Sequence, residues 1–437
     1  MPPPLTQTLG SLLGDDQVVR VEATPTLSRA LGGCVPPVAV MPQTALQLAT
    51  LLKLAAENGL ALIPYGTELA CGAPPQKADV LLDLRQLEPI LEHEPGDLTV
   101  RASASTSFAL LQDTLARHEQ RLPIEAPAAA ATLGDLLATR ASGPRRLAFG
   151  TLRDHVLGLS VATPDGKITR CGGRVVKNVT GYDLMKLHVG ALHTLGIVLE
   201  LNLRLQPRPE RELAILAIFD RIAQACAFAH HMRLEPELQP VALDLATSLG
   251  SFADIPVKGA AIGVLFEGSE AAVEQQVDRA RTFLRDGVEV HLLAGRECEA
   301  LIERLTEARA IDVSDGPLLV VRCLAPRGQL AAVLEAVQRG PLGHRIPRCV
   351  GWAGLGIIDA MVGGDLDRDA DLPGEVAGLA QALAHLDGSL ALRAAPPFVW
   401  ATFVRPRSEA VARIERQLRT LVDPGQVLNP GRLSGLP

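Results

Sequence analysis

The sequence is poor in aromatic residues, because Phe, Trp and Tyr together make up 3% of its 437 residues. Recognition of single-stranded nucleic acid depends on stacking against aromatic side chains, so this composition argues against that function. The net charge is -7 and no long basic run occurs. Binding to a polyanion or to an anionic membrane surface is therefore not expected.

Several sequence motifs are also missing. The seven cysteines are widely spaced, and no C-x-x-C pair occurs, so we predict no zinc site, no iron–sulfur cluster and no other metal site. An odd number of scattered thiols favours a reduced, cytoplasmic protein. Walker A, G-x-G-x-x-G, H-E-x-x-H and G-x-S-x-G motifs are absent, which argues against classical nucleotide, zinc-protease and hydrolase sites.

Membrane insertion is not expected either. No segment offers roughly twenty uninterrupted apolar residues, the length that a transmembrane helix requires. The first residues, Met1 to Pro4, do not form a basic region followed by an apolar run, so no signal peptide is predicted.

The apolar residues that are present, 47% of the chain, suffice for two or three cores. Residues 44–59 are predicted to form a helix, with Thr44 as its cap, apolar residues at helical spacing and Gly59 at its end. Strands are expected at 60–63, 80–84, 90–93, 98–102, 156–162, 167–170 and 199–205. The alternation of strands with helices indicates an α/β or α+β domain, and of these two the α+β class is the prediction.

Pro207 and Pro209 interrupt the pattern and indicate a domain boundary. Strands and amphipathic helices then restart, which predicts a smaller α+β domain with a sheet covered on one face. The expected organisation is an N-terminal extension over 1–38, a first domain over 39–208, a second domain over 209–405, and a C-terminal helix and tail over 406–437.

An ordered series of small-residue motifs lies between residues 127 and 205. It comprises Ala131-Thr132-Leu133-Gly134, Ser142-Gly143-Pro144-Arg145-Arg146, Gly150-Thr151-Leu152-Arg153-Asp154, Gly172-Gly173-Arg174-Val175-Val176-Lys177-Asn178-Val179-Thr180-Gly181-Tyr182-Asp183 and Thr194-Leu195-Gly196-Ile197-Val198. The tail reads Leu428-Asn429-Pro430-Gly431-Arg432. Together these motifs resemble the FAD-binding (E-type) subunit of bacterial glycolate oxidase, a member of the FAD-linked oxidases of PCMH/VAO type. The resemblance covers nearly all of 40–210 and the tail.

This resemblance implies an FAD-binding domain of two α+β subdomains, followed by a smaller cap domain, with the tail returning to the FAD-binding domain. Glycine lacks a Cβ and reaches positive φ, so it lets backbone N–H groups approach a diphosphate. The implied FAD-binding residues are Pro64, Tyr65, Gly66, Thr67, Glu68, Leu69, Thr132, Leu133, Gly134, Ser142, Gly143, Gly150, Arg153, Asp154, Gly196, Ile197, Val198 and Asn429.

Four positions depart from the family pattern, because Glu68, Asp135, Arg140 and His193 stand where glycine is expected. A carboxylate in contact with a diphosphate is repelled by roughly 1 kcal/mol, and a Cβ at positive φ adds strain. These departures keep open a second interpretation, in which the chain retains the fold but has lost FAD and serves as a structural or assembly subunit.

By resemblance, the chain oxidises glycolate or another small 2-hydroxy acid with FAD, or relays electrons. It would associate with a catalytic FAD subunit and an iron–sulfur subunit, and be peripheral to the membrane through these partners. A stand-alone oxidase of a sugar or alcohol is a third interpretation. The sequence assigns no catalytic residue: Arg393 and Arg405 are candidate carboxylate clamps, but solvated surface arginines are favoured, and His385 is expected to be structural.

Overall fold

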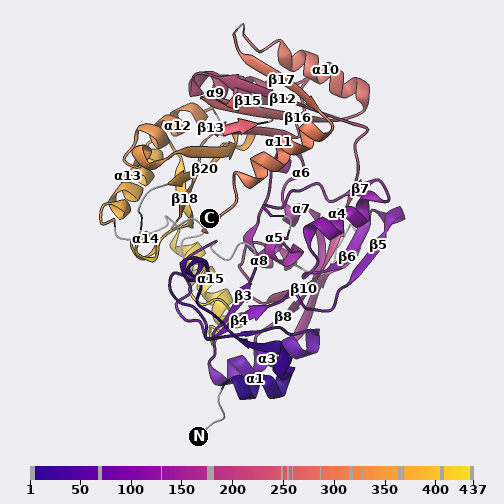
Figure 1. Cartoon of the computed structure of the whole chain (residues 1–437), viewed down its shortest axis with the longest axis vertical. Coiled ribbons are helices and arrows are strands. Elements are labelled where there is room, and N and C mark those ends of the chain that lie inside the picture. The colour runs from indigo at the N-terminus through magenta and orange to yellow at the C-terminus, as the bar shows by residue number, and fades with distance from the viewer. Residues whose placement is uncertain are drawn as a thin grey trace.

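The computed structural model describes residues 5–66, 71–128, 130–174, 182–247, 250–252, 255–257, 259–285, 287–313, 318–326, 328–362, 366, 369–403 and 408–433. The chain forms two bodies, shown in indigo to magenta and in red to orange in Figure 1. The first body holds two sheets, and the second is built on one large sheet. The α+β class predicted from the sequence is confirmed.

The first sheet has four strands in the order β1-β2-β4-β3, of which β2, β4 and β3 are parallel. Its apolar core is completed by α1 and α3. Helix α3 confirms the predicted helix, because a capping box joins Thr44 to Gln47 at its start and Gly59 adopts φ 62° at its end. The elements are α1 (Leu5–Leu13), β1 (Val18–Arg20), α2 (Pro25–Ala30), β2 (Val38–Val40), α3 (Ala45–Asn58), β3 (Leu62–Tyr65) and β4 (Val80–Asp83).

The second sheet is antiparallel, with the order β5-β6-β10-β8-β9. Helices α4 and α5 pack on it through Leu111, Leu115, Leu133, Leu136 and Leu137. The elements are β5 (Leu91–Glu94), β6 (Thr99–Ser103), α4 (Phe108–Ala116), β7 (Gln120–Arg121), α5 (Leu133–Thr139), α6 (Arg146–Phe149), α7 (Leu152–His155), β8 (Val156–Ala162), β9 (Ile168–Gly172), α8 (Met185–His188), β10 (Ile197–Arg204) and β11 (Gln206–Pro207).

The second body contains an eight-stranded antiparallel sheet in the order β17-β12-β16-β13-β19-β20-β18-β21. Its strands are β12 (Arg211–Phe219), β13 (Ala242–Thr247), β16 (Ala260–Gly268), β17 (Glu289–Ala294), β18 (Leu319–Leu324), β19 (Arg348–Trp352), β20 (Ile357–Val362) and β21 (Ser389–Ala394), and a separate ladder joins β14 (Gly250–Phe252) to β15 (Ile255–Val257). The helices are α9 (Ile222–Leu234), α10 (Glu270–Arg281), α11 (Arg296–Glu307), α12 (Leu330–Arg339), α13 (Leu372–Ala384) and α14 (Pro397–Thr402).

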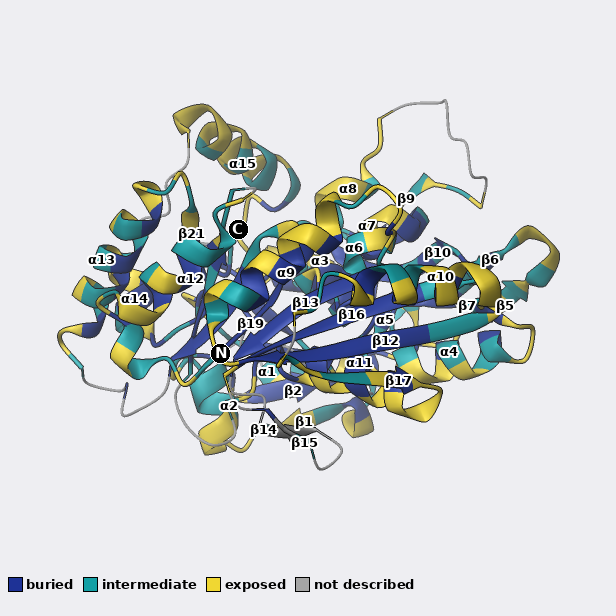
Figure 2. Ribbon diagram, turned by 90° about the horizontal axis from the view of Figure 1, so that it is seen from above, coloured by how far each residue is buried: buried dark blue, intermediate teal, exposed yellow. Residues whose placement is uncertain are grey.

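Helices cover both faces of this large sheet, whereas the sequence predicted one covered face. Helices α9, α10, α12 and α13 pack on one face. On the other face, α11 packs so closely that a Cβ on Gly263 would lie 3.1 Å from Leu305. Leu192 and Phe149 of the first body also contact this face. The strands are therefore deeply buried while the outer helix faces remain exposed (Figure 2).

The C-terminal segment returns to the first body after α15 (Glu409–Val422). Leu62 N donates to Val427 O at 2.7 Å, and Asn429 N donates to Leu62 O at 3.0 Å. Residues near the C-terminus thereby extend the first sheet beside β3. Among the described helices, the longest and most apolar still falls short of what crossing a bilayer requires.

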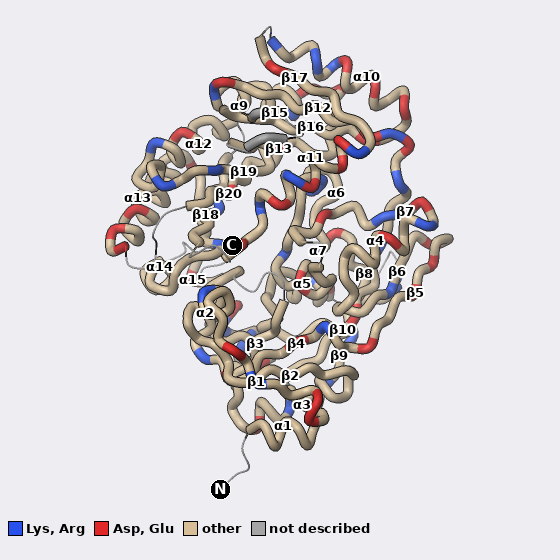
Figure 3. Tube along the Cα trace, in the orientation of Figure 1, with Lys and Arg blue, Asp and Glu red and all other residues tan. Residues whose placement is uncertain are grey.

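Ion pairs fasten the two bodies together at the start of α6. Arg145 binds Glu125 of the first body at 2.9 Å and reaches across to Glu212 at 3.1 Å and to Glu267. Arg121 binds the same two carboxylates of the second body. Figure 3 shows acidic and basic positions side by side in this region, between α6 and α11.

Candidate functional site

A pocket of about 600 Å³, including its open mouth, lies in the first body beside the N-terminus of α5. We call it the α5 pocket. It is lined by segments that are far apart in the sequence: Pro64, Tyr65, Gly66, Leu84, Arg85, Ala104, Ser105, Thr132, Gly134, Asp135, Ala138, Thr139, Leu192, His193, Val198, Asn429 and Arg432. Of the residues that the sequence singled out, the structure brings seven together here: Pro64, Tyr65, Gly66, Thr132, Gly134, Val198 and Asn429.

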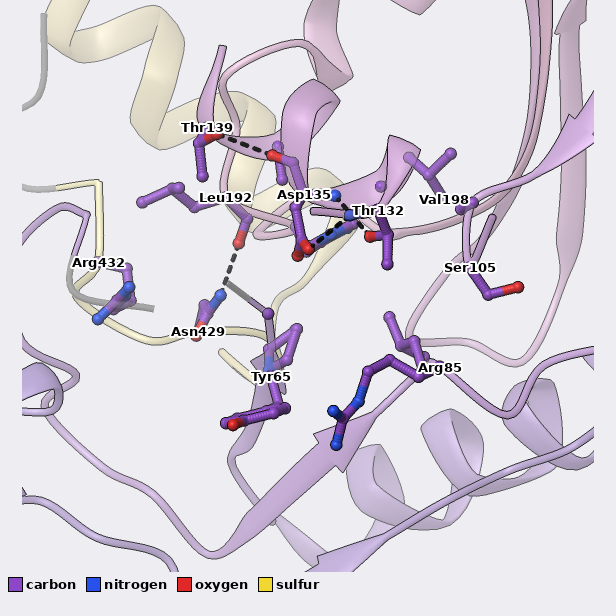
Figure 4. Close-up of a pocket in the computed structure, with 17 residues that line it drawn as sticks. Tyr65, Arg85, Ser105, Thr132, Asp135, Thr139, Leu192, Val198, Asn429 and Arg432 are labelled. Carbon is purple, nitrogen blue, oxygen red and sulfur yellow. Dashed lines mark hydrogen bonds between the residues drawn. The ribbon is translucent and has the colours of Figure 1, made fainter. Parts of the chain in front are cut away.

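The backbone N–H groups at the start of α5 already have acceptors. Asp135 accepts from Thr132 N at 3.0 Å through its carboxylate, and Asp135 N donates to Thr132 Oγ1 at 3.1 Å (Figure 4). Leu133 N donates to Thr106 O at 3.0 Å, and Gly134 N donates to Ala104 O at 2.9 Å. An incoming anion would have to displace such contacts to reach these amides.

The Asp135 carboxylate also contacts the loop after β3. A Cβ built on Gly66 would overlap Asp135 Oδ1. A side chain at position 66 would therefore displace the Asp135 carboxylate from this arrangement. The contact puts a negative charge between α5 and residues 64–66, where the resemblance expects a diphosphate.

Two arginines oppose this negative charge from other walls of the pocket. Arg85 binds Asp83 and lies over the Tyr65 ring, with 5.0 Å from Cζ to the ring centroid. Arg432 is buried and donates from Nη2 to Cys71 O at 2.8 Å. Burial lowers the pKa of Arg432 to about 10, so an anion beside it would be stabilised.

Asn429 offers the pocket an unused acceptor. Its Nδ2 donates to Leu192 O at 2.6 Å, but its buried Oδ1 has no hydrogen-bond partner among the described residues. A dinucleotide carries hydroxyl and amino donors as well as phosphates. The unused acceptor, the two guanidinium groups and the close glycine backbone therefore fit such a ligand, and the Asp135 carboxylate is the group that must turn away.

Two of the four glycine replacements adopt left-handed backbone. Arg140 has φ 54° and ends α5, and His193 has φ 58° before β10. Both positions thus retain the conformation that favours glycine. Asp135 differs, because it lies inside α5. Glu68 and the neighbouring predicted residues Thr67 and Leu69 lie outside the described residues.

Eight other predicted residues do not line the α5 pocket. Gly150, at φ 76°, ends α6, and exposed Asp154 accepts from Thr151 N at 2.8 Å. These two residues therefore stabilise the start of α7, which contains exposed Arg153. Leu133 is buried in the core, Gly196 precedes β10, and Ile197 pairs with β8. Ser142 lines a different cavity, and Gly143 O accepts a hydrogen bond from Trp352 of that cavity.

That second cavity is small and lies between the two bodies, and we call it the arginine cavity. The first body contributes Pro127, Arg140, Ala141 and Ser142, and the second contributes Thr306, Arg309, Arg322, Trp352 and Arg393. Arg393 is 7% exposed, so the prediction of a solvated surface arginine is wrong. Arg405 lies outside the described residues.

Trp352 organises the arginine cavity. Its Nε1 donates to Gly143 O at 2.7 Å, which joins the second body to the first. The guanidinium groups of Arg309, Arg146 and Arg322 lie 4.5, 5.1 and 5.2 Å from its ring centroid. Each contact is a cation–π interaction, so one ring holds three like charges near each other.

Two buried carboxylates offset part of this charge. Arg309 binds Asp244, and Asp359 binds Arg322 at 2.6 Å and Arg393 at 3.3 Å. Burial raises the pKa of Asp244 to about 6 despite its pairing with Arg309. Burial also acts to raise the pKa of Asp359, but Arg322 and Arg393 outweigh it and hold that pKa below its ordinary value.

Sequence reasoning missed the convergence at this cavity, although a signal was present. Asp244, Arg322, Asp359 and Arg393 each interrupt an otherwise apolar strand of the second body. A charged residue inside a buried strand needs a partner, so four such residues of opposite sign predict mutual pairing. Among the described residues, no cluster of His, Cys, Asp or Glu side chains could hold a metal ion.

Comparison with known proteins finds an FAD-binding domain in this chain. Residues 36–172 match a family model described as an FAD binding domain. The chain is 26% identical over 427 residues to glycolate oxidase subunit GlcD of Bacillus subtilis (strain 168), covering 91% of this chain and 89% of that protein. It is 38% identical over 136 residues to glycolate oxidase subunit GlcE of Escherichia coli (strain K12), covering 31% of this chain and 39% of that protein.

The fold comparison extends over the whole chain. A crystal structure of p-cresol methylhydroxylase with substrate bound matches with a TM-score of 0.75 at 16% sequence identity, covering 99% of this chain and 96% of that chain. An alkyldihydroxyacetonephosphate synthase matches with a TM-score of 0.72 at 16% identity, covering 98% and 86%. The chain therefore carries an FAD-binding domain and has the VAO/PCMH-type fold, and the proteins it is similar to include FAD-dependent oxidoreductases.

Proposed function

We propose that this chain oxidises a small 2-hydroxy acid, with FAD held from the α5 pocket toward the arginine cavity. The observation that carries the proposal is the position of that cavity. It lies where the FAD-binding domain meets the second body, and it gathers arginines that suit a carboxylate. Relatives named as a glycolate oxidase subunit and as D-lactate dehydrogenase support the substrate class.

Particular residues would hold each part of the system. Gly66, Arg85, Arg432 and Asn429 suit the dinucleotide at the α5 pocket. FAD, when bound, accepts the hydride of the alcohol carbon, and the protein supplies position and electrostatics. In the arginine cavity, guanidinium groups can bind a carboxylate through paired N–H donors and so orient the acid. Trp352 forms one wall of that cavity.

The first experiment follows the flavin itself. The purified chain should absorb between roughly 350 and 500 nm, where a bound flavin shows. Under anaerobic conditions, glycolate or D-lactate should bleach this band in a single turnover. A chain that carries flavin but is bleached by no 2-hydroxy acid would contradict the proposed substrate class.

The assembly proposal rests on relatives that are named as subunits. We infer that the chain works in a complex with a second FAD-binding subunit, which is catalytic, and an iron–sulfur subunit. The described part of the chain holds no candidate cluster site, so a cluster would lie on a partner. Co-purification from the native source, followed by iron and flavin analysis, would test this composition.

A second candidate function is a non-catalytic assembly subunit. The observation that favours it is Asp135, whose carboxylate occupies the start of α5 and contacts Gly66. In that case the purified chain would be colourless, reconstitution with FAD would fail, and the chain would still support activity of its partners. Recovery of the yellow chromophore on reconstitution would exclude this candidate.

A further inference from the structure

A wide groove lies between α4 of the first body and α11 of the second (Figure 1). We call it the interbody groove, and its volume is about 780 Å³. Residues 121–128 and 208–212 form its remaining walls together with Arg145. The groove shares no lining residue with the α5 pocket, and it shares only Pro127 and Thr306 with the arginine cavity. It is therefore a separate surface from the site of the proposed function.

The buried part of the groove lining is apolar. Leu122 and Ile124 come from the first body and Ile302 comes from α11, and each is at most 4% exposed. Pro123 and Pro127 also line the groove, and neither has a backbone N–H to offer a ligand. Apolar groups placed against these residues would leave water, which favours binding.

The charged residues of the groove are mostly acidic. Seven carboxylates and four guanidinium groups line it. Two further charges lie next to this lining: Glu267, which is bound by Arg121 and Arg145, and Arg304, whose Nη1 lies 3.8 Å from Glu307 Oε2. Eight carboxylates against five guanidinium groups leave an excess of three negative charges.

Two of the arginines are already used in joining the bodies. Arg121 and Arg145 bind Glu125, Glu212 and Glu267, so that network holds three carboxylates for two guanidinium groups. Burial raises the pKa of Glu125, although Arg145 acts in the opposite direction. The network therefore has no positive charge to spare for the other acids of the groove.

The acids that lack partners lie on the two helices. Glu299, Glu303 and Glu307 recur every four residues, so they follow one face of α11 over about 12 Å. Glu299 and Glu303 are exposed, as is Asp113 on α4, and none of these three forms an ion pair with another described residue.

The segment that joins the bodies does not offset these acids. Arg208 and Arg211 line the groove there with Glu210 between them, which leaves one positive charge on that wall. The groove thus combines an apolar base with an acidic row along α11.

We propose that the interbody groove is a docking site for a segment of a partner protein that carries arginine or lysine beside apolar residues. The apolar side chains of the segment pack on Leu122, Ile124 and Ile302, and its cations pair with Glu299 and Glu303. A row of about 12 Å matches several residues of an extended chain, which advances about 3.3 Å per residue, better than it matches one small cation. The negative charge of a 2-hydroxy acid does not suit this groove, so the inference does not rest on the proposed oxidation.

Peptide probes test the chemistry of the segment. Three fluorescein-labelled octapeptides alternate leucine with arginine, leucine with glutamate, and serine with arginine, and fluorescence anisotropy follows their binding to the purified chain. The leucine–arginine peptide should saturate one site per chain, bind at least about tenfold more tightly than the other two, and weaken as salt is added. Equal binding of the three peptides, or no saturable binding of the first, would overturn the proposal. Calorimetric binding of spermidine without binding of the leucine–arginine peptide would overturn it in favour of a small cation.

Paired variants assign the binding to the groove. Glu299→Gln together with Glu303→Gln removes two exposed carboxylates and leaves the network that joins the bodies intact, so the chain should fold. Its affinity for the leucine–arginine peptide should fall about fivefold, because two surface ion pairs are lost. The matched control is Glu270→Gln together with Glu274→Gln, which removes two exposed glutamates at the same spacing on α10 and should keep the wild-type affinity. Full affinity in the α11 variant, or an equal loss in the α10 control, would show that the peptide binds elsewhere or responds only to net charge.

Discussion

At the start of α5, the Asp135 carboxylate accepts the backbone hydrogen bond that a bound anion could otherwise accept. Its carboxylate accepts from Thr132 N and presses against Gly66, so it competes for the place of a diphosphate. Asp135→Asn keeps an oxygen for Thr132 N and removes the charge. We expect FAD to bind about fivefold more tightly to this variant, because a repulsion of roughly 1 kcal/mol is removed.

A fluorescence titration of FAD, with the loss of flavin emission on binding, measures this effect. The matched control is Asp97→Asn, which removes an exposed carboxylate outside the α5 pocket and should leave the dissociation constant unchanged. Unchanged affinity in Asp135→Asn would show that the carboxylate does not face the cofactor.

The two tryptophans form a natural pair for testing the contact between the bodies. Trp352 donates to Gly143 O, whereas Trp400 Nε1 is buried without a partner among the described residues. Trp352→Phe should lower the free energy of unfolding by about 1 kcal/mol more than Trp400→Phe, because only Trp352 loses a buried hydrogen bond; Gly143 O keeps its bond from Arg146 N. Urea unfolding followed by circular dichroism measures both, and equal losses would contradict the role of the indole N–H.

At the scale of elements, substitutions of Asn429 test how the C-terminal segment is held against the first body. This residue is buried, has φ 47° and donates to Leu192 O. Asn429→Gly loses the side-chain bond but keeps an easy left-handed backbone, while Asn429→Ala loses both. The alanine variant should unfold with a free energy about 1 kcal/mol lower than the glycine variant. A glycine variant less stable than the alanine variant in urea unfolding would exclude backbone strain as the cause.

Local elements were predictable because their signals are local. The helix after Thr44 has its cap, its apolar spacing and its terminal glycine within the sixteen residues 44–59. The hairpin of β8 and β9 follows from the turn at Pro164 to Gly166. The positions of Arg140 and His193 followed from the glycine pattern, since both kept left-handed backbone.

The arginine cavity could not be predicted in the same way. Arg140 ends a helix of one body, while Arg322 and Arg393 lie on strands of the other that pair through the sheet. Their approach depends on how two bodies dock, and no short sequence window contains that information. Arg393 was wrongly expected at the surface because its partner, Asp359, lies on β20, two strands away across β18.

At the scale of the whole molecule, the docking depends on Arg145. It is held by Glu125, Glu212 and Glu267, all of which would lose a counter-charge in Arg145→Met. Removing one partner from a buried network costs about 3–5 kcal/mol. Arg339→Met, which breaks an exposed pair with Glu335, is the control and should cost less than about 1 kcal/mol. Calorimetric unfolding distinguishes the two.

The loss of folding stability in Arg145→Met should also depend on pH. Burial already raises the pKa of Glu125 and of Glu212 above the ordinary value with Arg145 in place, and loss of the guanidinium raises both further. A carboxyl whose pKa is higher in the folded state stabilises that state below its unfolded pKa and loses this effect as pH rises through the folded value. The variant should therefore recover stability relative to wild type from about pH 7 to about pH 5. A stability loss in Arg145→Met that grows as the pH falls would contradict the role given to Glu125 and Glu212.

The return of the C-terminal segment has a consequence for how the protein is made. Asn429 and Arg432 close a pocket whose other walls come from the first two hundred residues, and Leu62 finds its backbone partner only at Val427. On the ribosome, the pocket-lining residues of the first body emerge long before Asn429 and Arg432, which complete the pocket. Cofactor loading should thus follow the synthesis of nearly the entire polypeptide, and a nascent chain stalled before Val427 should not retain FAD.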